Sequence, residues 1–275
     1  MDASITSATF RCVNSLAWRE VVRFLRQRNR VIGAVGQPLL FWLLFGTGLN
    51  QSFRFQNASF SEYFIPGTLV LILLFTAIFA TISIIEDRQE GFLQAVLVAP
   101  VPRVAFVLGK VAGGTLLAVI QALIFLLLSR FGTTSSAPWA AASLPALVAL
   151  MTLVAIGFTA LGFCIAWRLD STQGFHAIMN LLLMPMWLLS GAFFPVPRWQ
   201  DGTWGERVLN LVMRCNPVTY AVAGLRRMLS ATPDAASEAW SPPLAASWLI
   251  AILFAGAMLL MATRMSRVPA SGDYR

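Results

Sequence analysis

Six long apolar segments limit what this chain can fold into more than any other feature of its sequence. A helix needs about 20 residues to cross the hydrocarbon layer of a membrane. Segments of roughly this length lie at residues 31–50, 65–85, 104–129, 141–167, 175–195 and 244–263. In lipid every backbone amide has to be paired within the protein, so such segments form helices. We predict an all-α membrane protein with six transmembrane helices, folded as a single transmembrane domain over residues 1–275.

The overall composition agrees with a membrane location. Hydrophobic residues make up 57% of the chain and charged residues 12%, and the mean hydropathy is +0.72. The net charge of +8 does not indicate a nucleic-acid-binding protein, because the arginines gather at the ends of apolar segments rather than along one solvated surface. Three scattered cysteines without ligand spacing predict neither a metal site nor a disulfide framework.

The distribution of basic residues predicts the orientation. With the N-terminus inside, the inner segments hold thirteen of the 20 Lys and Arg residues and the outer segments hold seven. Inner loops carry the excess of basic residues in membrane proteins. We therefore expect a multi-pass protein of the inner cell membrane with both termini in the cytoplasm and a long outer loop over residues 195–243.

Residues 1–30 are rich in arginine and predict an amphipathic helix. Arg19, Arg23, Arg26 and Arg30 fall on one helical face, opposite apolar residues. A helix of this kind lies along the membrane surface. Its arginines either set the topology and contact anionic membrane lipid, or additionally contact a cytoplasmic partner and transmit its motion.

The inner segment 86–110, EDRQEGFLQAVLVAPVPRVAFVLGK, stands out between two apolar segments. It opens with a charged group made of Glu86, Asp87, Arg88 and Glu90. Residues 91–98 predict a short amphipathic helix, after which prolines stop the helix and stiffen the chain. The charges are either solvated caps of a helix or the docking surface of a cytoplasmic partner.

Energy for transport would have to come from such a partner. We expect the apolar segments to hold no charged residue at depth, whereas carriers driven by protons or sodium usually bury one. The chain also lacks the G-x-x-x-x-G-K-[ST] loop that cradles nucleotide phosphates, since Val104 stands where the first glycine would be. Any ATP would therefore act on a separate subunit, and we expect this chain to bind no cofactor.

Three stretches resemble the ATP-binding-cassette type-2 permeases in the correct order. The first is 86–110, where the matching residues are Glu86, Gly91, Pro100, Arg103, Gly109 and Lys110, while Phe92 and Gln94 depart from the family pattern. Pro102, the second stiffening proline, is also a candidate coupling residue. The second is LLSGAFFPVPRW at 188–199. The third is CNPVTYAVAGLRRML at 215–229, which supplies Asn216, Pro217, Tyr220 and Arg226. The chain is similar to this family over nearly its whole length.

The resemblance implies a function and a set of partners. In the family, 86–110 is a cytoplasmic coupling loop with a coupling helix, and the outer loop forms helices that re-enter the membrane. It also implies an ATP-binding-cassette ATPase that holds the ATP, and a second permease, either a copy or a paralogue. The expected activity is outward transport of a hydrophobic or amphipathic substrate such as a lipid, a glycan-lipid or a drug.

Two apolar faces are candidates for the substrate path. Phe75, Phe79 and Ile82 share one face of the second segment, and Met186, Leu189 and Phe193 share one face of the fifth. Both sets could equally face lipid or pack in the bundle. Other functions are also open, namely a passive assembly subunit or an intramembrane enzyme. An enzyme would need Ser190 and His176 to meet, and 14 residues of one helix separate them by about 20 Å.

Overall fold

A computed structural model describes residues 2–48, 60–98, 102–130, 144–197, 199, 203–229 and 240–267, and within these ranges every regular element is an α-helix. The helices are α1 (Asp2–Arg26), α2 (Arg28–Gly48), α3 (Phe60–Ala80), α4 (Ile82–Gln89), α5 (Phe92–Val98), α6 (Arg103–Ser129), α7 (Leu144–Arg168), α8 (Thr172–Leu188), α9 (Trp204–Cys215), α10 (Pro217–Leu229) and α11 (Leu244–Met265). The all-α prediction is confirmed for the described residues.

Four stretches of the described chain are long and apolar enough to cross a membrane. They are Glu62–Gln89, which joins α3 and α4, then Arg103–Ser129, Leu144–Arg168 and Leu244–Met265. Helices α2 and α8 occupy the places of the other two expected spans, but neither is among these four stretches; α8 has only 17 residues, and α2 contains Pro38. A count of six therefore stays a prediction from the sequence.

The fifth apolar segment was expected to be helical through residue 195, and this is wrong. Helix α8 ends at Leu188, and Gly191 adopts a positive φ of 77°. Glycine reaches this left-handed conformation without the steric cost that other residues carry, so it breaks the helix there. The following residues leave the helix axis and pack back against the bundle.

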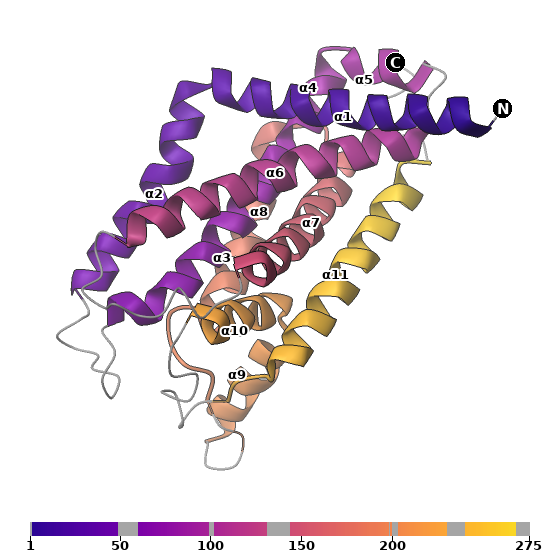
Figure 1. Ribbon diagram of the computed structural model, residues 1–275. Helices are drawn as coiled ribbons and strands as arrows, with labels where there is room; N and C mark the ends of the chain where they lie inside the picture. Colours follow the sequence, from indigo (N-terminus) through magenta and orange to yellow (C-terminus); the bar gives the residue numbers. More distant parts are fainter. Residues whose placement is uncertain are drawn as a thin grey trace.

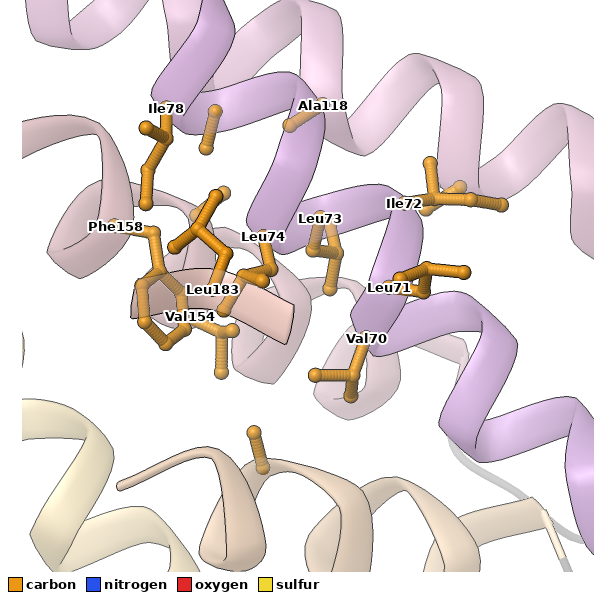
Figure 2. Close-up of a cluster of buried hydrophobic side chains, with 14 of the residues drawn as sticks. Val70, Leu71, Ile72, Leu73, Leu74, Ile78, Ala118, Val154, Phe158 and Leu183 are labelled. Carbon is orange, nitrogen blue, oxygen red and sulfur yellow. The ribbon is translucent and has the colours of Figure 1, made fainter. Parts of the chain in front are cut away.

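Helix α3 forms the centre of the bundle, and every side chain from Thr68 to Leu74 is buried. Figure 2 shows its apolar side chains beside those of α6, α7 and α8, with Val70, Leu71, Ile72, Leu73, Leu74, Ile78, Ala118, Val154, Phe158 and Leu183 labelled. Small residues bring the helices close together: a Cβ on Gly162 of α7 would lie 2.7 Å from Oγ1 of Thr81. Close backbone approach is the usual way in which helices pack inside lipid.

The two ends of the bundle differ in what they hold. Helices α1, α4 and α5 lie at one end, and α9 and α10 lie at the other (Figure 1). Helix α11 ends on the α1 side, because Arg103 at the start of α6 donates to the carbonyls of Ser266 and Arg267. The first and last described helices thus reach the same end, as the expected topology requires, while the side of the membrane that this end faces stays a prediction.

Candidate coupling segment and apolar groove

A cluster of charged side chains joins α1 to the segment 86–110, and its centre is Asp87. This carboxylate is fully buried and accepts hydrogen bonds from the two terminal guanidinium nitrogens of Arg19 at 3.1 and 2.7 Å and from Arg23 at 2.9 Å. Arg23 also contacts Glu86 at 3.0 Å and Glu90 at 3.2 Å. These links to Asp87 raise the pKa of Arg19 above its ordinary value.

Lys110 completes the charge cluster from α6. Its Nζ donates to Glu20 Oε1 at 2.7 Å, to Ser83 Oγ at 3.0 Å and to Asp87. Lys110 is 3% exposed and Glu20 is 5% exposed. Lys110 was expected in the cytoplasmic loop 86–110, and its burial against Glu20 and Asp87 was not predicted from the sequence. Burial of these charges is tolerated because each has an opposite charge within hydrogen-bond distance.

Two glycines allow α1 to lie directly on α6. A Cβ on Gly109 would be 2.7 Å from the Cβ of Leu16, and one on Gly113 would be 2.8 Å from the Cβ of Glu20. Both distances are shorter than side chains permit. The spacing G-x-x-x-G is a known signal for close helix packing in membranes, so it could have marked this face of α6 as a packing surface, without saying which helix packs there.

The arginines of the predicted coupling residues bind the ends of other helices. Arg88 donates to the carbonyls of Trp167 at 2.8 Å and Leu169 at 3.1 Å, at the end of α7, and Arg103 binds the end of α11 in the same way. A cation at a helix C-terminus pairs with carbonyls that have no partner within the helix and with the negative end of its dipole. The coupling segment, which runs into the start of α6, is thus attached to α1, α7 and α11.

The short helix predicted over residues 91–98 is present as α5. Gly91 precedes it with a φ of +74°, which allows the sharp turn out of α4. The guanidinium of Arg19 lies 3.7 Å from the ring centre of Phe92, so α1 also contacts α5. Gln94 and Val98 are exposed, Val98 to 85%. This outward face of α5 is accessible to a partner protein.

The ten predicted coupling residues differ in exposure. Asp87, Gly109 and Lys110 are buried, Glu86, Arg88 and Gly91 are half-buried, Glu90, Pro102 and Arg103 are exposed, and Pro100 lies outside the described residues. A coupling role stays a prediction for all of them. A docked protein could not touch the buried residues, so any coupling role of theirs would be indirect, through the residues that they contact.

The α1 arginines have partners within the chain that the sequence did not indicate. Arg19 and Arg23 point at the carboxylates of α4, and a role with lipid or with a cytoplasmic partner stays a prediction. Periodicity identifies the residues that share a face, and it does not say what covers that face. Arg26 is exposed, and Arg30 lies where side chains are not described.

An apolar groove of about 240 Å³ lies between α2, α3 and α8, next to the end of α1. Its lining is Phe24, Pro38, Phe41, Leu71, Ile72, Phe75, Thr76, Phe79, Ala80, Ile82, His176, Met184 and Trp187. The rings of Phe75 and Phe79 are 5.6 Å apart, and His176 lies 5.2 Å from Phe79. The groove offers aromatic surface with few polar groups.

The groove contains half of the predicted path residues. Phe75, Phe79 and Ile82 line it, although a break at Thr81 separates Ile82 from the other two. The other set, Met186, Leu189 and Phe193, does not line it. Because α8 ends at Leu188, Phe193 leaves the helical face and packs among Phe45, Phe60, Phe64 and Trp187. On α8 the groove is lined by Met184 and Trp187, where Met186 and Leu189 had been expected.

The segment 215–229 forms a junction at the opposite end of the bundle. Asn216 donates to the carbonyls of Met186 at 2.6 Å and Leu189 at 3.0 Å, and its side-chain oxygen accepts from the Val218 amide at the start of α10. One residue thereby caps the beginning of α10 and the end of α8. Pro217 is the first residue of α10, where a proline costs no hydrogen bond.

The other two predicted residues of this segment also have partners. Arg226 donates to the Gly191 carbonyl at 2.9 Å and lies 4.0 Å from the ring centre of Tyr63. Tyr220 packs edge-on against Trp240, with ring centres 6.3 Å apart. Helix α10 is mostly buried against α3, α7 and α11, whereas α9 exposes Trp204 to 82%.

The fold and these sites define a multi-pass helical membrane protein with a charged segment fixed to one end of its bundle. The chain belongs to the ABC-2 type transporter family, whose model matches residues 11–229. It is therefore a transport permease, a membrane subunit of an ABC transporter.

Individual relatives agree with the family. The chain is 25% identical over 228 residues to the ycf38 protein of Porphyra purpurea, provisionally named a transport permease, covering 80% of this chain and 74% of that one. Its identity to the ycf38 protein of Cyanophora paradoxa is 27% over 222 residues, covering 78% and 73%. The inner membrane transport permease YadH of Escherichia coli is 21% identical over 222 residues, covering 78% and 81%.

Proposed function

We propose that this chain is the membrane-spanning half of an ATP-driven exporter, which moves a hydrophobic or amphipathic substrate outward while a separate ATP-binding-cassette ATPase binds and hydrolyses the ATP. The observation that supports this most is the attachment of the coupling segment: its internal face is fixed to α1, α7 and α11, and α5 exposes Val98 beyond it. A force applied to α5 would therefore reach most of the bundle.

The groove between α2, α3 and α8 is the proposed substrate path. Its aromatic lining suits an acyl chain or a ring system, because apolar contact is favourable and no charge has to be desolvated there. In the proposed transporter a second permease, a copy or a paralogue, faces the first. The coupling end and both termini face the cytoplasm of a cell whose inner membrane holds the protein.

The outer loop 195–243 is proposed to dip into the outer leaflet and return. Helix α10 is too short to span the membrane. Its apolar residues are buried against three other helices, and this packing would let the segment lie inside the membrane without crossing it. Helix α9 exposes Trp204, Val208, Leu211 and Val212, and an exposed apolar face of this kind fits the membrane interface.

An intramembrane hydrolase gains no support from the described residues. The Ser190 hydroxyl is buried and donates to the Trp187 carbonyl at 2.5 Å, beyond the end of α8. His176 lies in the first turns of the same helix and faces the groove. A serine nucleophile needs a base within hydrogen-bond distance.

The test is co-purification of the chain with an ATPase from its own cell. The purified chain alone should turn over no ATP, and the recovered complex should hydrolyse it. Val98→Asn on α5 should reduce recovery of the ATPase, while Val208→Asn on α9, at the other end of the bundle, should not. Nucleotide turnover by the chain alone, or equal recovery with both variants, would contradict the proposal.

A further inference from the structure

Helices α3 and α8 form two walls of the groove and run antiparallel, in a register that their contacts fix. The ring centre of His176 in α8 lies 5.2 Å from that of Phe79 in α3. Nearer the other end of α8, the Trp187 indole donates to the Gly67 carbonyl of α3 at 2.8 Å. Each turn forward along α8 therefore corresponds to about one turn back along α3.

Asn180 lies on the groove-facing side of α8, at the middle of this register. It comes four residues after His176 and four before Met184, which both line the groove, so the three share one helical face. One turn onward from His176 corresponds to one turn back from Phe79, which is where Thr76 lies. Asn180 is exposed, and the described part of the chain offers its amide no hydrogen bond. An amide in this state is unfavourable in lipid.

Thr76 brings a hydroxyl oxygen to the same level from α3. Its side chain is 8% exposed and lines the groove. Thr68 and Thr159, which are also buried, donate to the carbonyl four residues back in their own helices. Thr76 donates instead to Gln121 Oε1 of α6 at 2.6 Å. The Thr76 oxygen therefore keeps lone pairs that can accept a hydrogen bond from the groove.

Gln121 makes this hydroxyl adaptable. Gln121 is 4% exposed, and its Nε2 is buried with no hydrogen-bond partner among the described residues. A buried donor without a partner is unfavourable. Rotation of the amide by half a turn would bring Nε2 to the Thr76 oxygen, and the Thr76 proton would then be free for donation into the groove. The pair can thus accept a hydrogen bond from a ligand or donate one to it.

We propose that Asn180 and Thr76 are specificity-determining residues that hold an uncharged hydroxyl or amide group of the substrate, while its apolar parts occupy the groove on either side. This proposal rests on the proposed function, because it takes the groove as the substrate path. The described lining contains no carboxylate, ammonium or guanidinium group, so an ionised group would lose its hydration without gaining a counter-charge. An uncharged group needs only the donors and acceptors that these two side chains offer.

The size of the groove limits the apolar part of the ligand. An apolar cavity of about 150 Å³ holds one benzene molecule, and the groove measures about 240 Å³. On one side of the polar pair its lining is Leu71, Met184 and Trp187, and on the other side it includes Phe79 and Ile82. The indole nitrogen of Trp187 is already paired. The ligand is therefore a single chain or a small ring system that carries one polar group, rather than a whole two-chain lipid.

The test uses the full chain in nanodiscs and a photoreactive decanol, with its hydroxyl at the middle of the chain and a diazirine at one end. Mass spectrometry locates the labelled residues. The competitors are unlabelled decanol, decane and the phosphate ester of the same decanol, so only the polar group differs. Labelling should be saturable and fall on groove residues. Decanol should compete about two- to tenfold better than decane, as one net hydrogen bond predicts, and better than the phosphate ester.

Two substitutions remove the hydrogen-bonding groups and keep a similar side-chain size, Asn180→Leu and Thr76→Val. Each should lower the preference for decanol over decane, and together they should abolish it, while decane competes as before. Thr76→Ser retains the hydroxyl and should keep the preference. The matched controls, which should also keep it, are Gln173→Leu, at an exposed amide of α8 outside the groove lining, and Thr152→Val, at a hydroxyl that donates within its own helix.

The contrary results are distinct. Saturable labelling without a preference in the unaltered chain, a full preference in the double variant, or stronger competition by the phosphate ester would each overturn the inference. An unchanged preference in Asn180→Leu together with a smaller assembly would show that a second permease covers Asn180, and would overturn its assignment. Absence of saturable labelling would refute the groove as the substrate path, and the inference with it. Failure to recover an ATPase would refute the proposed exporter and leave the binding preference measurable.

Discussion

Replacing Lys110 by methionine tests whether the charge cluster stabilises the fold as its geometry indicates. Methionine has a similar length and removes only the ammonium group. Glu20 Oε1 loses its contact at 2.7 Å and keeps only Arg19 at 3.8 Å, and Ser83 loses a donor at 3.0 Å. Asp87 keeps both arginines. The main cost is therefore one buried carboxylate without a close cation.

The size of this cost follows from measured analogues. Removing one partner of a buried ion pair costs about 3–5 kcal/mol, whereas exposed pairs are worth about 0–1 kcal/mol. Because Glu20 is 5% exposed, the buried value applies, and Lys110→Met should lower the free energy of unfolding by about 3 kcal/mol or more. The double variant Lys110→Met/Glu20→Gln should lose less than the single one, since an amide in place of the carboxylate removes the uncompensated charge.

The assay is reversible unfolding by sodium dodecyl sulfate in micelles, followed by fluorescence of the tryptophans. Arg264→Met, at an exposed site near the end of α11, is the matched control and should change little. A loss below about 1 kcal/mol for Lys110→Met would show that the ammonium is not compensating a buried carboxylate. Additive costs in the double variant would show that Lys110 and Glu20 are not coupled.

Three further predictions concern packing, the opposite junction and topology. Gly113→Leu should displace α1 from α6 and lower thermal stability, whereas Gly256→Leu, where a Cβ would meet no atom within 4 Å, should not; equal melting temperatures would contradict the packing. Arg226→Met should destabilise the junction by about 1–3 kcal/mol through loss of a charged hydrogen bond, and unchanged unfolding would refute this. After replacement of the three native cysteines, a cysteine at Glu206, an exposed residue of α9 off its apolar face, should react with an impermeant thiol reagent added to intact cells, and one at Glu90 should not; the reverse pattern would invert the proposed topology.

Local patterns decided much of the architecture. Apolar length predicts helices in a membrane, because lipid allows few other backbone arrangements, and the helical content is confirmed in the described residues. The apolar stretch between Gly91 and the prolines predicted a short helix over residues 91–98, and this helix is present as α5. The family was also within reach, because its three motifs occur in order along the chain.

The sequence alone did not show which charges are internal. Arg19, Glu20 and Arg23 are about 65 to 90 positions away from Asp87 and Lys110 along the chain, so no periodicity relates them. They meet only because α1 folds back across α6, where Gly109 and Gly113 leave room. Likewise the end of α8 depends on a backbone turn at Gly191, which removed Phe193 from the expected helical face. Composition and period determine that the elements are helices, whereas the contact between distant helices determines whether a charge is a surface group or part of the core.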